Sequence, residues 1–396
     1  MNLLKLSWKN ISARPLNATL NILLLALGVA IISLMLQVGK QLEDTLNRNI
    51  KQIDMVMGAK GSPLQLILSA VFQIDAPTGN ISLAEANRIA KSPLVKNAIP
   101  LAYGDSYRGF RIVGTEKGYA DLYQAELGEG KFFEQSFQVV LGANAARELR
   151  LNIGDKFQSQ HGLDAEGEDH EAHFFEVVGI LKPSGTVADQ LLLTSVSSVW
   201  EAHHHEEDEH SEEEETQEIT AMLIQFRSPM GMVQLPRYVN EKTNMQSALP
   251  SYEVYRLLDL MGIGISLLQS LALGIMVVSG LSLFISLYNA LKERKYEMAL
   301  LRNFGASRLA LVQLVLQEGI LLTTIGFALG ILLSRLGFWA FTQLTAESYH
   351  YQLGFQPFMA EEAYLLVGAI LIGILASILP AIQVFRLQIS KVLGEN

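Results

Sequence analysis

Four long apolar stretches stand out from the pattern of hydrophobic and polar positions along this 396-residue chain. A helix needs about 20 apolar residues to cross a bilayer, and each stretch is long enough. The pattern therefore predicts four transmembrane helices, at residues 18–38, 261–291, 309–341 and 363–385. The first exceeds the apolar core of about 7–15 residues typical of a signal peptide, so we interpret it as a retained anchor.

Shorter apolar runs fill the region between the first two spans. Strand-like runs and helix-like runs follow one another in mixed order, which favours an α+β fold, predicted to form two lobes. The predicted strands are residues 110–114, 139–141, 156–160, 174–181, 191–194 and 221–226, and the predicted helices are residues 83–91 and 143–149. We therefore expect an α-helical membrane protein with four transmembrane helices and an α+β extracytoplasmic domain inserted between the first and second spans.

Lysines and arginines set the expected orientation, because cytoplasmic loops are enriched in them. They flank the first span at Lys5, Lys9 and Arg14, recur between the second and third spans, and return in the C-terminal tail. The loop at residues 342–362 has none. Both termini are thus predicted to be cytoplasmic, with the large domain periplasmic or extracellular and the chain in a bacterial inner membrane.

These patterns divide the chain into nine consecutive segments. We predict a cytoplasmic amphipathic helix, the first span, the extracytoplasmic domain, the second span, a cytoplasmic coupling helix, the third span, a short outer loop, the fourth span and a cytoplasmic tail, at residues 1–17, 18–38, 39–260, 261–291, 292–308, 309–341, 342–362, 363–385 and 386–396.

Composition agrees with this organisation and excludes some functions. The chain is 49% hydrophobic and 18% charged, with a mean hydropathy of +0.25, which is too apolar for an ordinary soluble enzyme. Residues 40–256 hold 19 basic and 32 acidic residues, a net charge of −13. Nucleic-acid binding is not expected, because it needs a concentrated basic face. With no cysteine, the chain has no disulfide and no cysteine-based metal site.

No catalytic motif is evident in the sequence. The phosphate-binding pattern G-x-x-x-x-G-K-[ST] is missing, as are HExxH and any clear Ser/His/Asp set. The chain is therefore predicted to bind no ATP of its own and not to act alone as an enzyme.

The segment KERKYEMALLRNFGAS at residues 292–307, with Glu318 in the span that follows, resembles the signature of the MacB/FtsX-like permeases of ABC transporters. The tail LPAIQVFRLQISKVL is also similar to that family's ending, although Val384 and Ile389 depart from it. The stretch VVLGANAARELRLNIGDKF resembles the family's outer lobe, and one span, a large domain and three spans is the family's topology.

The resemblance implies a separate ABC ATPase subunit, present in two copies, and a second permease copy or paralogue. ATP would then act only through that partner. The short helix in residues 292–308 is expected to dock on the ATPase, with Gly305 ending it and Ser307 capping the next span. The expected coupling residues are Arg294, Glu297, Met298, Leu301, Arg302 and Gly305.

Charged residues within the spans suggest further contacts. Glu318 and Arg335 are costly in hydrocarbon, so they should face protein or lie near the interfaces. They could pair across a permease dimer, or Arg335 could reach the outer surface by itself. In the second span, Gly274 and Gly280 favour close helix packing. Residues 58–81 form either a partner-contacting element or a buried core helix.

Seven of the eight histidines lie in two polar insertions, at residues 160–173 and 203–217. Imidazole and carboxylate groups are ligands that zinc accepts. The insertions are surface loops that either bind zinc or a similar divalent ion, or are only solvated. The candidate ligands are His161, His170, His173, His203, His204, His205 and His210.

Together these features predict the membrane permease subunit of an ABC system, which couples ATP hydrolysis to movement of its outer domain. The output would be export, lipoprotein release or control of a periplasmic protein or lipoprotein partner. One alternative is a zinc-linked transport or sensing system that uses the histidine-rich loops. An alternative of another class is a membrane sensor or scaffold without transport.

Overall fold

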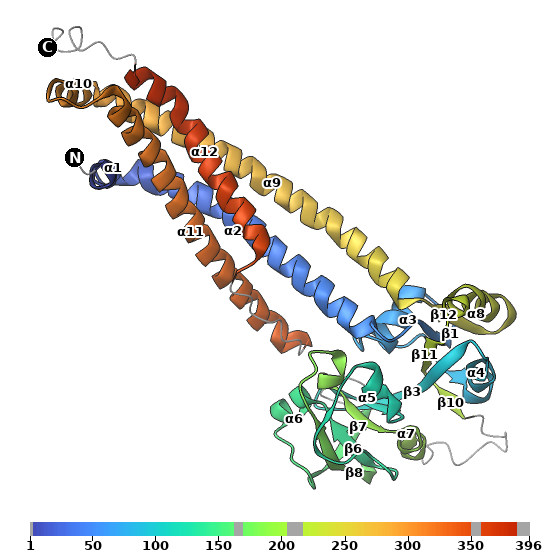
Figure 1. Ribbon diagram of the computed structural model, residues 1–396. Coiled ribbons are helices and arrows are strands. Elements are labelled where there is room, and N and C mark those ends of the chain that lie inside the picture. Colours follow the sequence, from blue (N-terminus) through green and yellow to red (C-terminus); the bar gives the residue numbers. More distant parts are fainter. Residues whose placement is uncertain (1–2, 162–168, 204–216, 350–357, 386–396) are drawn as a thin grey trace. The chain divides into compact units, whose positions relative to one another are not determined.

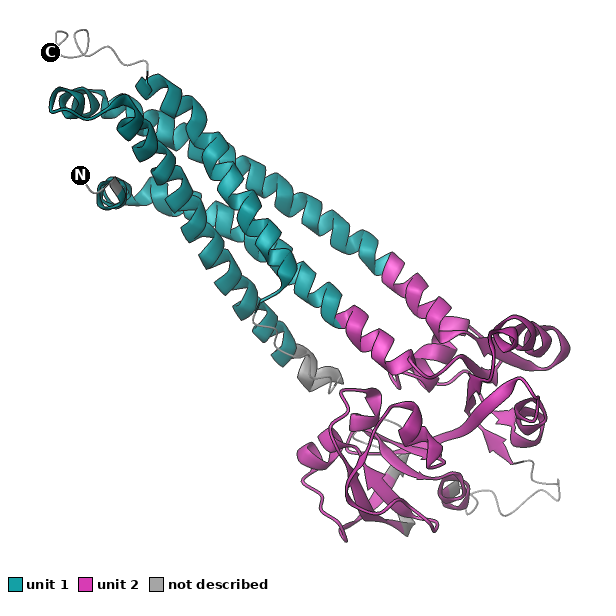
Figure 2. Ribbon diagram, in the orientation of Figure 1, with its two compact units in different colours: residues 1–41, 260–396 teal, residues 42–259 magenta. Residues whose placement is uncertain are grey.

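The computed structural model describes residues 3–161, 169–203, 217–349 and 358–385. Contacts divide the chain into two compact units, residues 1–41 with 260–396, and residues 42–259 (Figure 2). The first unit holds most of the long apolar helices and the second holds the β-sheet. The histidine-rich stretch at residues 204–216 lies outside the described residues, as do residues 162–168.

The described part of the first unit contains helices and short connections (Figure 1). Among the described residues, four helices are long and apolar enough to cross a membrane. The helices are α1 (Leu3–Ser12), α2 (Pro15–Ile50), α9 (Pro250–Glu293), α10 (Lys295–Asn303), α11 (Arg308–Tyr349) and α12 (Ala360–Phe385). Helices α2 and α9 are longer than the predicted spans and continue into the second unit.

Glycines allow α11 and α12 to lie side by side (Figure 1). A Cβ on Gly319 would lie 2.8 Å from the carbonyl oxygen of Gly373, and a Cβ on Gly373 would lie 2.5 Å from Oγ1 of Thr323. Such short separations leave no room for a side chain, so the two backbones approach as closely as small residues permit.

The second unit has a mixed ten-stranded sheet, in the order β12-β1-β11-β3-β4-β9-β6-β8-β5, with β7 paired to β3 and β8. A separate pair joins β10 and β2. The strands are β1 (Met55–Ala59), β2 (Ile81–Ser82), β3 (Val95–Tyr107), β4 (Phe110–Thr115), β5 (Leu127–Gly130), β6 (Gln138–Leu141), β7 (Lys156–His161), β8 (Asp169–Leu181), β9 (Leu192–Ser195), β10 (Glu218–Ile219), β11 (Ala221–Phe226) and β12 (Met245–Ala248).

Helices pack on this sheet and confirm the α+β fold class. They are α3 (Pro63–Ala70), α4 (Leu83–Ala90), α5 (Gly118–Leu122), α6 (Ala143–Leu149), the short 3-10 helix Val187–Gln190, α7 (Val196–His203) and α8 (Pro229–Lys242). Strand β3 connects two parts of the sheet, because its first half pairs with β11 and its second half with β4 and β7. Different apolar clusters lie on the two parts.

Residues 58–81 contain the buried helix α3. Ser62 caps its N-terminus by accepting a hydrogen bond from the backbone N–H of Gln65 at 3.5 Å. Leu66, Ile67 and Ala70 are buried in the main core of the second unit. This agrees with the core-helix alternative for the segment.

The first histidine-containing insertion is not a loop throughout, contrary to the sequence prediction. Strand β7 reaches His161 and β8 begins at Asp169, and Gln160 pairs with Asp169. The strand pair of β7 and β8 therefore extends into this insertion.

Candidate functional site

The turn between α10 and α11 has the caps that the sequence predicts. Gly305 has a φ of +98°, and its N–H donates to the carbonyl of Arg302 at 3.0 Å. The N–H of Ala306 donates to the carbonyl of Leu301 at 3.0 Å, which completes a Schellman motif. Ser307 Oγ then accepts from the N–H of Ala310 at 3.1 Å, capping α11. The ends of α10 and α11 are therefore fixed locally.

The predicted coupling residues do not share one face of α10. Met298 is only 4% exposed and packs with Leu311, Leu314 and Val384 of its own chain. Met298 therefore packs against its own chain here, and its contact with an ATPase stays a prediction. An amphipathic pattern defines an apolar face but does not say which partner covers it.

The remaining coupling residues divide between exposed and enclosed positions. Glu297 and Gly305 are exposed, whereas Leu301 and Arg302 are half-buried. Arg294, predicted to face the ATPase, instead has a side chain that is only 11% exposed. The helix thus offers a partner fewer of these side chains than the sequence suggested.

Arg294 joins three helices at the start of α10. Its Nη2 donates to the backbone carbonyl of Asn10 in α1 at 2.9 Å, and its Nη1 lies 3.6 Å from Oε1 of Glu318 in α11. The amide of Asn10 donates to the same Oε1 at 2.5 Å. Nearby, Arg14 pairs with Glu293. Glu318 therefore has its partners within one chain and does not need a second copy for them.

A second buried polar cluster surrounds Glu362 near the start of α12. Nη2 of Arg335 in α11 lies 2.7 Å from Oε2 of Glu362. Ser33 of α2 donates to Oε1 of Glu362 at 2.6 Å and contacts Ser334 at 2.9 Å, and Gln37 Nε2 donates to Ser334 at 2.8 Å. The cluster joins α2, α11 and α12.

This cluster gives Arg335 a partner within its own chain. The side chain does not extend alone to the surface, because Glu362 binds it, and a contact of Arg335 with a second copy stays a prediction. Sequence reasoning missed Glu362, which it placed in a short outer loop. Two adjacent carboxylates at a helix start indicate favourable interaction with the helix dipole, and nothing in that pattern indicates that one is buried.

The second unit encloses an arginine among aromatic side chains. Arg111 lies over the Tyr103 ring at 5.0 Å and donates to Gln73 Oε1 at 3.3 Å. The Tyr103 hydroxyl is 2.6 Å from Gln73 Nε2. Burial lowers the pKa of Arg111 and raises the pKa of both Tyr103 and Tyr119 above the ordinary value.

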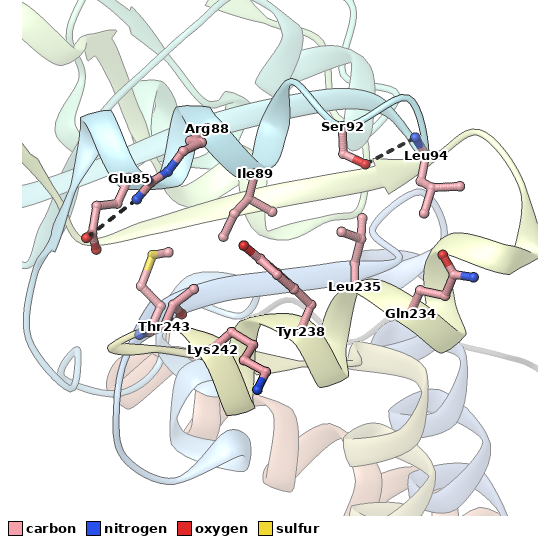
Figure 3. A pocket seen from close by; sticks show the side chains of 11 residues that line it. Glu85, Arg88, Ile89, Ser92, Leu94, Gln234, Leu235, Tyr238, Lys242 and Thr243 are labelled. Carbon is pink, nitrogen blue, oxygen red and sulfur yellow. Dashed lines mark hydrogen bonds and ion pairs between the residues drawn. The ribbon is translucent and has the colours of Figure 1, made fainter.

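A groove of about 630 Å³ lies between α4 and α8 in the second unit. Figure 3 shows Tyr238 pointing from α8 toward Ile89 of α4, with Leu235 beside them. Arg88 and Lys242 lie along its edges. The groove thus combines an apolar interior with charged borders, a composition typical of binding surfaces.

The histidines predicted to hold a metal fall largely on residues without a described environment. His204, His205 and His210 lie outside the described residues, and only the backbone of His161, His170, His173 and His203 is described, in β7, β8 and α7. Within the part of the chain that the structure describes, no group of three or more His, Asp or Glu side chains is placed to hold a metal.

Comparison with protein families adds to this description. The model of the MacB-like periplasmic core domain matches residues 18–237, more than half of the chain. The model of the FtsX-like permease C-terminal domain matches residues 270–389. The chain belongs to the MacB/FtsX-like permease family. As an ABC transporter permease component, it joins four membrane-spanning helices to a MacB-like periplasmic domain.

One curated relative of this MacB/FtsX-like permease shows limited sequence identity. It is 24% identical over 405 residues to an uncharacterised ABC transporter permease protein of Mycobacterium tuberculosis, covering 96% of this chain and 43% of that one. The chain thus spans less than half the length of that relative.

Two solved structures are similar to part of this MacB/FtsX-like permease. The periplasmic region of MacB from Actinobacillus actinomycetemcomitans has 12% identity and a TM-score of 0.36, covering 54% of this chain and 97% of that one. The extracellular domain of the noncanonic ABC-type transporter YknZ from Gram-positive bacteria has 14% identity and a TM-score of 0.32, covering 49% and 98%.

Proposed function

We propose that this permease couples ATP hydrolysis by a separate ABC ATPase subunit to movement of its extracytoplasmic domain. It would act as a dimer with two ATPase subunits, in a bacterial inner membrane, with both termini in the cytoplasm. The movement would serve export, lipoprotein release or control of a periplasmic partner. The exposed apolar surface around α10 carries this proposal.

That surface differs from the one expected from the sequence. Phe304, which follows α10, is 78% exposed, and Tyr296 and Leu309 are also exposed. Glu297 is exposed among them. Large apolar side chains in water at the charged end of a membrane bundle favour contact with a protein partner. The proposed ATPase-docking residues are therefore Tyr296, Glu297, Phe304 and Leu309.

The contacts of Arg294 support a route for movement after docking. Arg294 lies between α9 and α10, and its side chain binds α1 and α11. Tilting α10 would therefore displace two further helices, because the buried charges resist separation. On α1, Leu4 and Trp8 are exposed. We propose that these two side chains enter the inner surface of the lipid bilayer.

The proposal can be tested by co-purification with ATPase subunits. The full chain would be co-expressed with each ABC ATPase of its source organism, and the retained ATPase and its ATP hydrolysis measured. We expect Phe304→Ala to weaken retention about tenfold or more, because truncating a central apolar contact costs about 2 kcal/mol. The thermal unfolding midpoint should be unchanged.

Two further variants make the test specific. Phe358→Ala is the matched control, because Phe358 is an exposed phenylalanine just before α12 and should not affect retention. Met298→Ala should instead destabilise the chain by about 2–5 kcal/mol, since it leaves a cavity in a buried cluster. If no ATPase is retained by the unmodified chain, the proposed coupling function is wrong.

Zinc-linked sensing or transport is a second candidate function. The observation that favours it is the placement of seven of the eight histidines in two insertions of one domain. Calorimetric titration of the full chain with zinc should show micromolar binding of defined stoichiometry. Replacing His203, His204, His205 and His210 by Asn should abolish it. Equal, weak binding in both proteins would remove this candidate.

A further inference from the structure

The groove between α4 and α8 has the features of a peptide-binding surface. Its interior is apolar, formed by Ile89, Leu235 and Met245, all of which are largely buried. The apolar cluster to which these residues belong also contains Met55, Met57 and Met222, which are fully buried and do not line the groove. Methionine side chains are flexible and polarisable, so Met245 at the groove can adjust to apolar side chains of different shapes.

One wall of the groove is a long ridge on α8. Met230, Gln234, Tyr238 and Lys242 follow one another at intervals of four residues, so they lie along one side of the helix. Gln234, Tyr238 and Lys242 line the groove, and Met230 is exposed one turn before them. The ridge is about 18 Å long, which matches five or six residues of an extended peptide.

Charge indicates what such a peptide carries. At one edge of the groove, Arg88 lies 3.9 Å from Glu85 of the same helix. At the other edge, Lys242 is paired with no carboxylate among the described residues. Residues 40–256 as a whole have a net charge of −13, so a strongly acidic partner would be repelled. A single carboxylate beside an apolar anchor fits both the local cation and the overall charge.

We propose that the groove between α4 and α8 binds a linear segment of another protein, whose apolar side chain enters between Ile89 and Leu235 and whose neighbouring carboxylate pairs with Lys242. Tyr238 contributes an exposed aromatic wall, a side chain that is enriched at sites of high binding energy. The ridge is longer than a small molecule, so a small molecule bound in the groove would leave Met230 exposed.

The proposal is tested with the full chain in lipid nanodiscs and a random nonapeptide library displayed on phage. We expect selected peptides to share an aliphatic or aromatic residue next to Asp or Glu. A synthetic consensus peptide is then titrated against variants by fluorescence anisotropy. Gln234→Trp fills the groove and should weaken binding at least tenfold. Lys242→Glu should weaken it similarly and should bind better a peptide with Lys in place of the acid.

Val233→Trp is the matched control, because Val233 is an exposed neighbour on α8 that does not line the groove. It should bind the peptide as the unmodified chain does. Unfolding midpoints check that the three variants remain folded. No shared motif, or consensus binding that survives Gln234→Trp, would overturn the proposal, and so would a motif without an acid. The test needs no ATPase, so its result is independent of the coupling function.

Discussion

The guanidinium of Arg335 and the carboxylate of Glu362 are 2.7 Å apart, and the Glu362 side chain has no exposed surface. The backbone N–H of Met359 also donates to Glu362, at 3.0 Å, and Ser33 donates to it from α2. A buried charge that loses its partner stays desolvated without compensation. Losing one of the two charges should therefore destabilise the fold more than losing both.

Removing one member of this pair should destabilise the chain more than removing both. Glu362→Leu removes the carboxylate that Arg335 binds while its charge stays buried, at an expected cost of about 3–5 kcal/mol. The double variant Arg335→Leu with Glu362→Leu should cost less, since no buried charge remains. Unfolding in lipid nanodiscs, followed by temperature or denaturant, measures the difference.

The exposed pair Arg237–Glu241 on α8 provides the control. Its two charges are in water, so Arg237→Leu should change stability by only about 0.3–0.5 kcal/mol. If Glu362→Leu changes the stability equally little, water or lipid headgroups reach the Arg335–Glu362 pair, and the pair is not buried.

The sequence predicted the main features of the fold because they follow from local patterns. Apolar length identified the four spanning helices, and short apolar runs identified β4, β6, β9 and β11. Strand β3 was missed, because it contains Pro100 and several polar residues, and its two halves serve different neighbours. The pairing of β3 with β11 joins residues more than a hundred positions apart, which a local pattern does not include.

The sites were harder to predict for a similar reason. The signature around α10 was recognised from its residues, but the partner of Met298 depended on how α10 packs. Asn10 and Glu362 were not anticipated because a single polar residue near a helix end is ordinary in water. Only the folded bundle brings Asn10 to Glu318 and Glu362 to Arg335.

The two glycines of α9 should respond differently to substitution. A Cβ on Gly280 would lie 2.9 Å from Ile372 of the same chain, whereas one on Gly274 has no described atom within 4 Å. Gly274→Leu should therefore leave the fold intact but prevent close approach of a second copy. A loss of about 1–2 kcal/mol reduces dimer formation about tenfold.

Mass photometry in nanodiscs or single-molecule photobleaching gives the dimer fraction. Gly280→Leu serves as the comparison, because it should lower the unfolding temperature through its clash with Ile372. An unchanged dimer fraction in Gly274→Leu would mean that the second copy does not approach this part of α9.

Buried tyrosines predict how the outer domain responds to alkali. Burial raises the pKa of Tyr103 and Tyr119 above the ordinary value of 10.0. The protonated form is thus favoured in the fold, and its contribution to stability is complete below pH 10 and is lost as pH rises above it. The unfolding midpoint should fall progressively as the pH rises above about 10.

Tyr103→Phe separates this effect from general alkaline damage. It removes the Tyr103–Gln73 hydrogen bond, so it should lower the free energy of unfolding by about 1 kcal/mol at pH 8. The further decrease in stability above pH 10 should be smaller than in the unmodified chain. Tyr252→Phe changes an exposed side chain and should behave as the unmodified chain. A pH profile that Tyr103→Phe leaves unchanged would exclude Tyr103 as its cause.

The junction of Arg294, Glu318 and Asn10 should keep α1 and α10 together during the ATPase cycle. Because the chain has no cysteine, single cysteines at Lys9 and Asn303 can carry spin labels without background labelling. In the complex with its ATPase, the distance between the labels should be narrow and should not change between the nucleotide-free and ATP-bound states. Glu318→Leu should broaden the distribution of label distances and make it depend on nucleotide. The ATPase should still be retained, because the surface around Phe304 is unaltered.

The exposed ion pair of Arg14 and Glu293 beside the junction supplies the comparison. Because the Glu293 side chain is 66% exposed, Glu293→Gln should change the distance between the labels little. Exchanging the charges, Arg294→Glu with Glu318→Arg, should restore the narrow distance if the ion pair itself holds the helices. A distance that changes with nucleotide in the unmodified complex would show that α1 moves independently of α10. The coupling function would then need another route, through α9 or α11 alone.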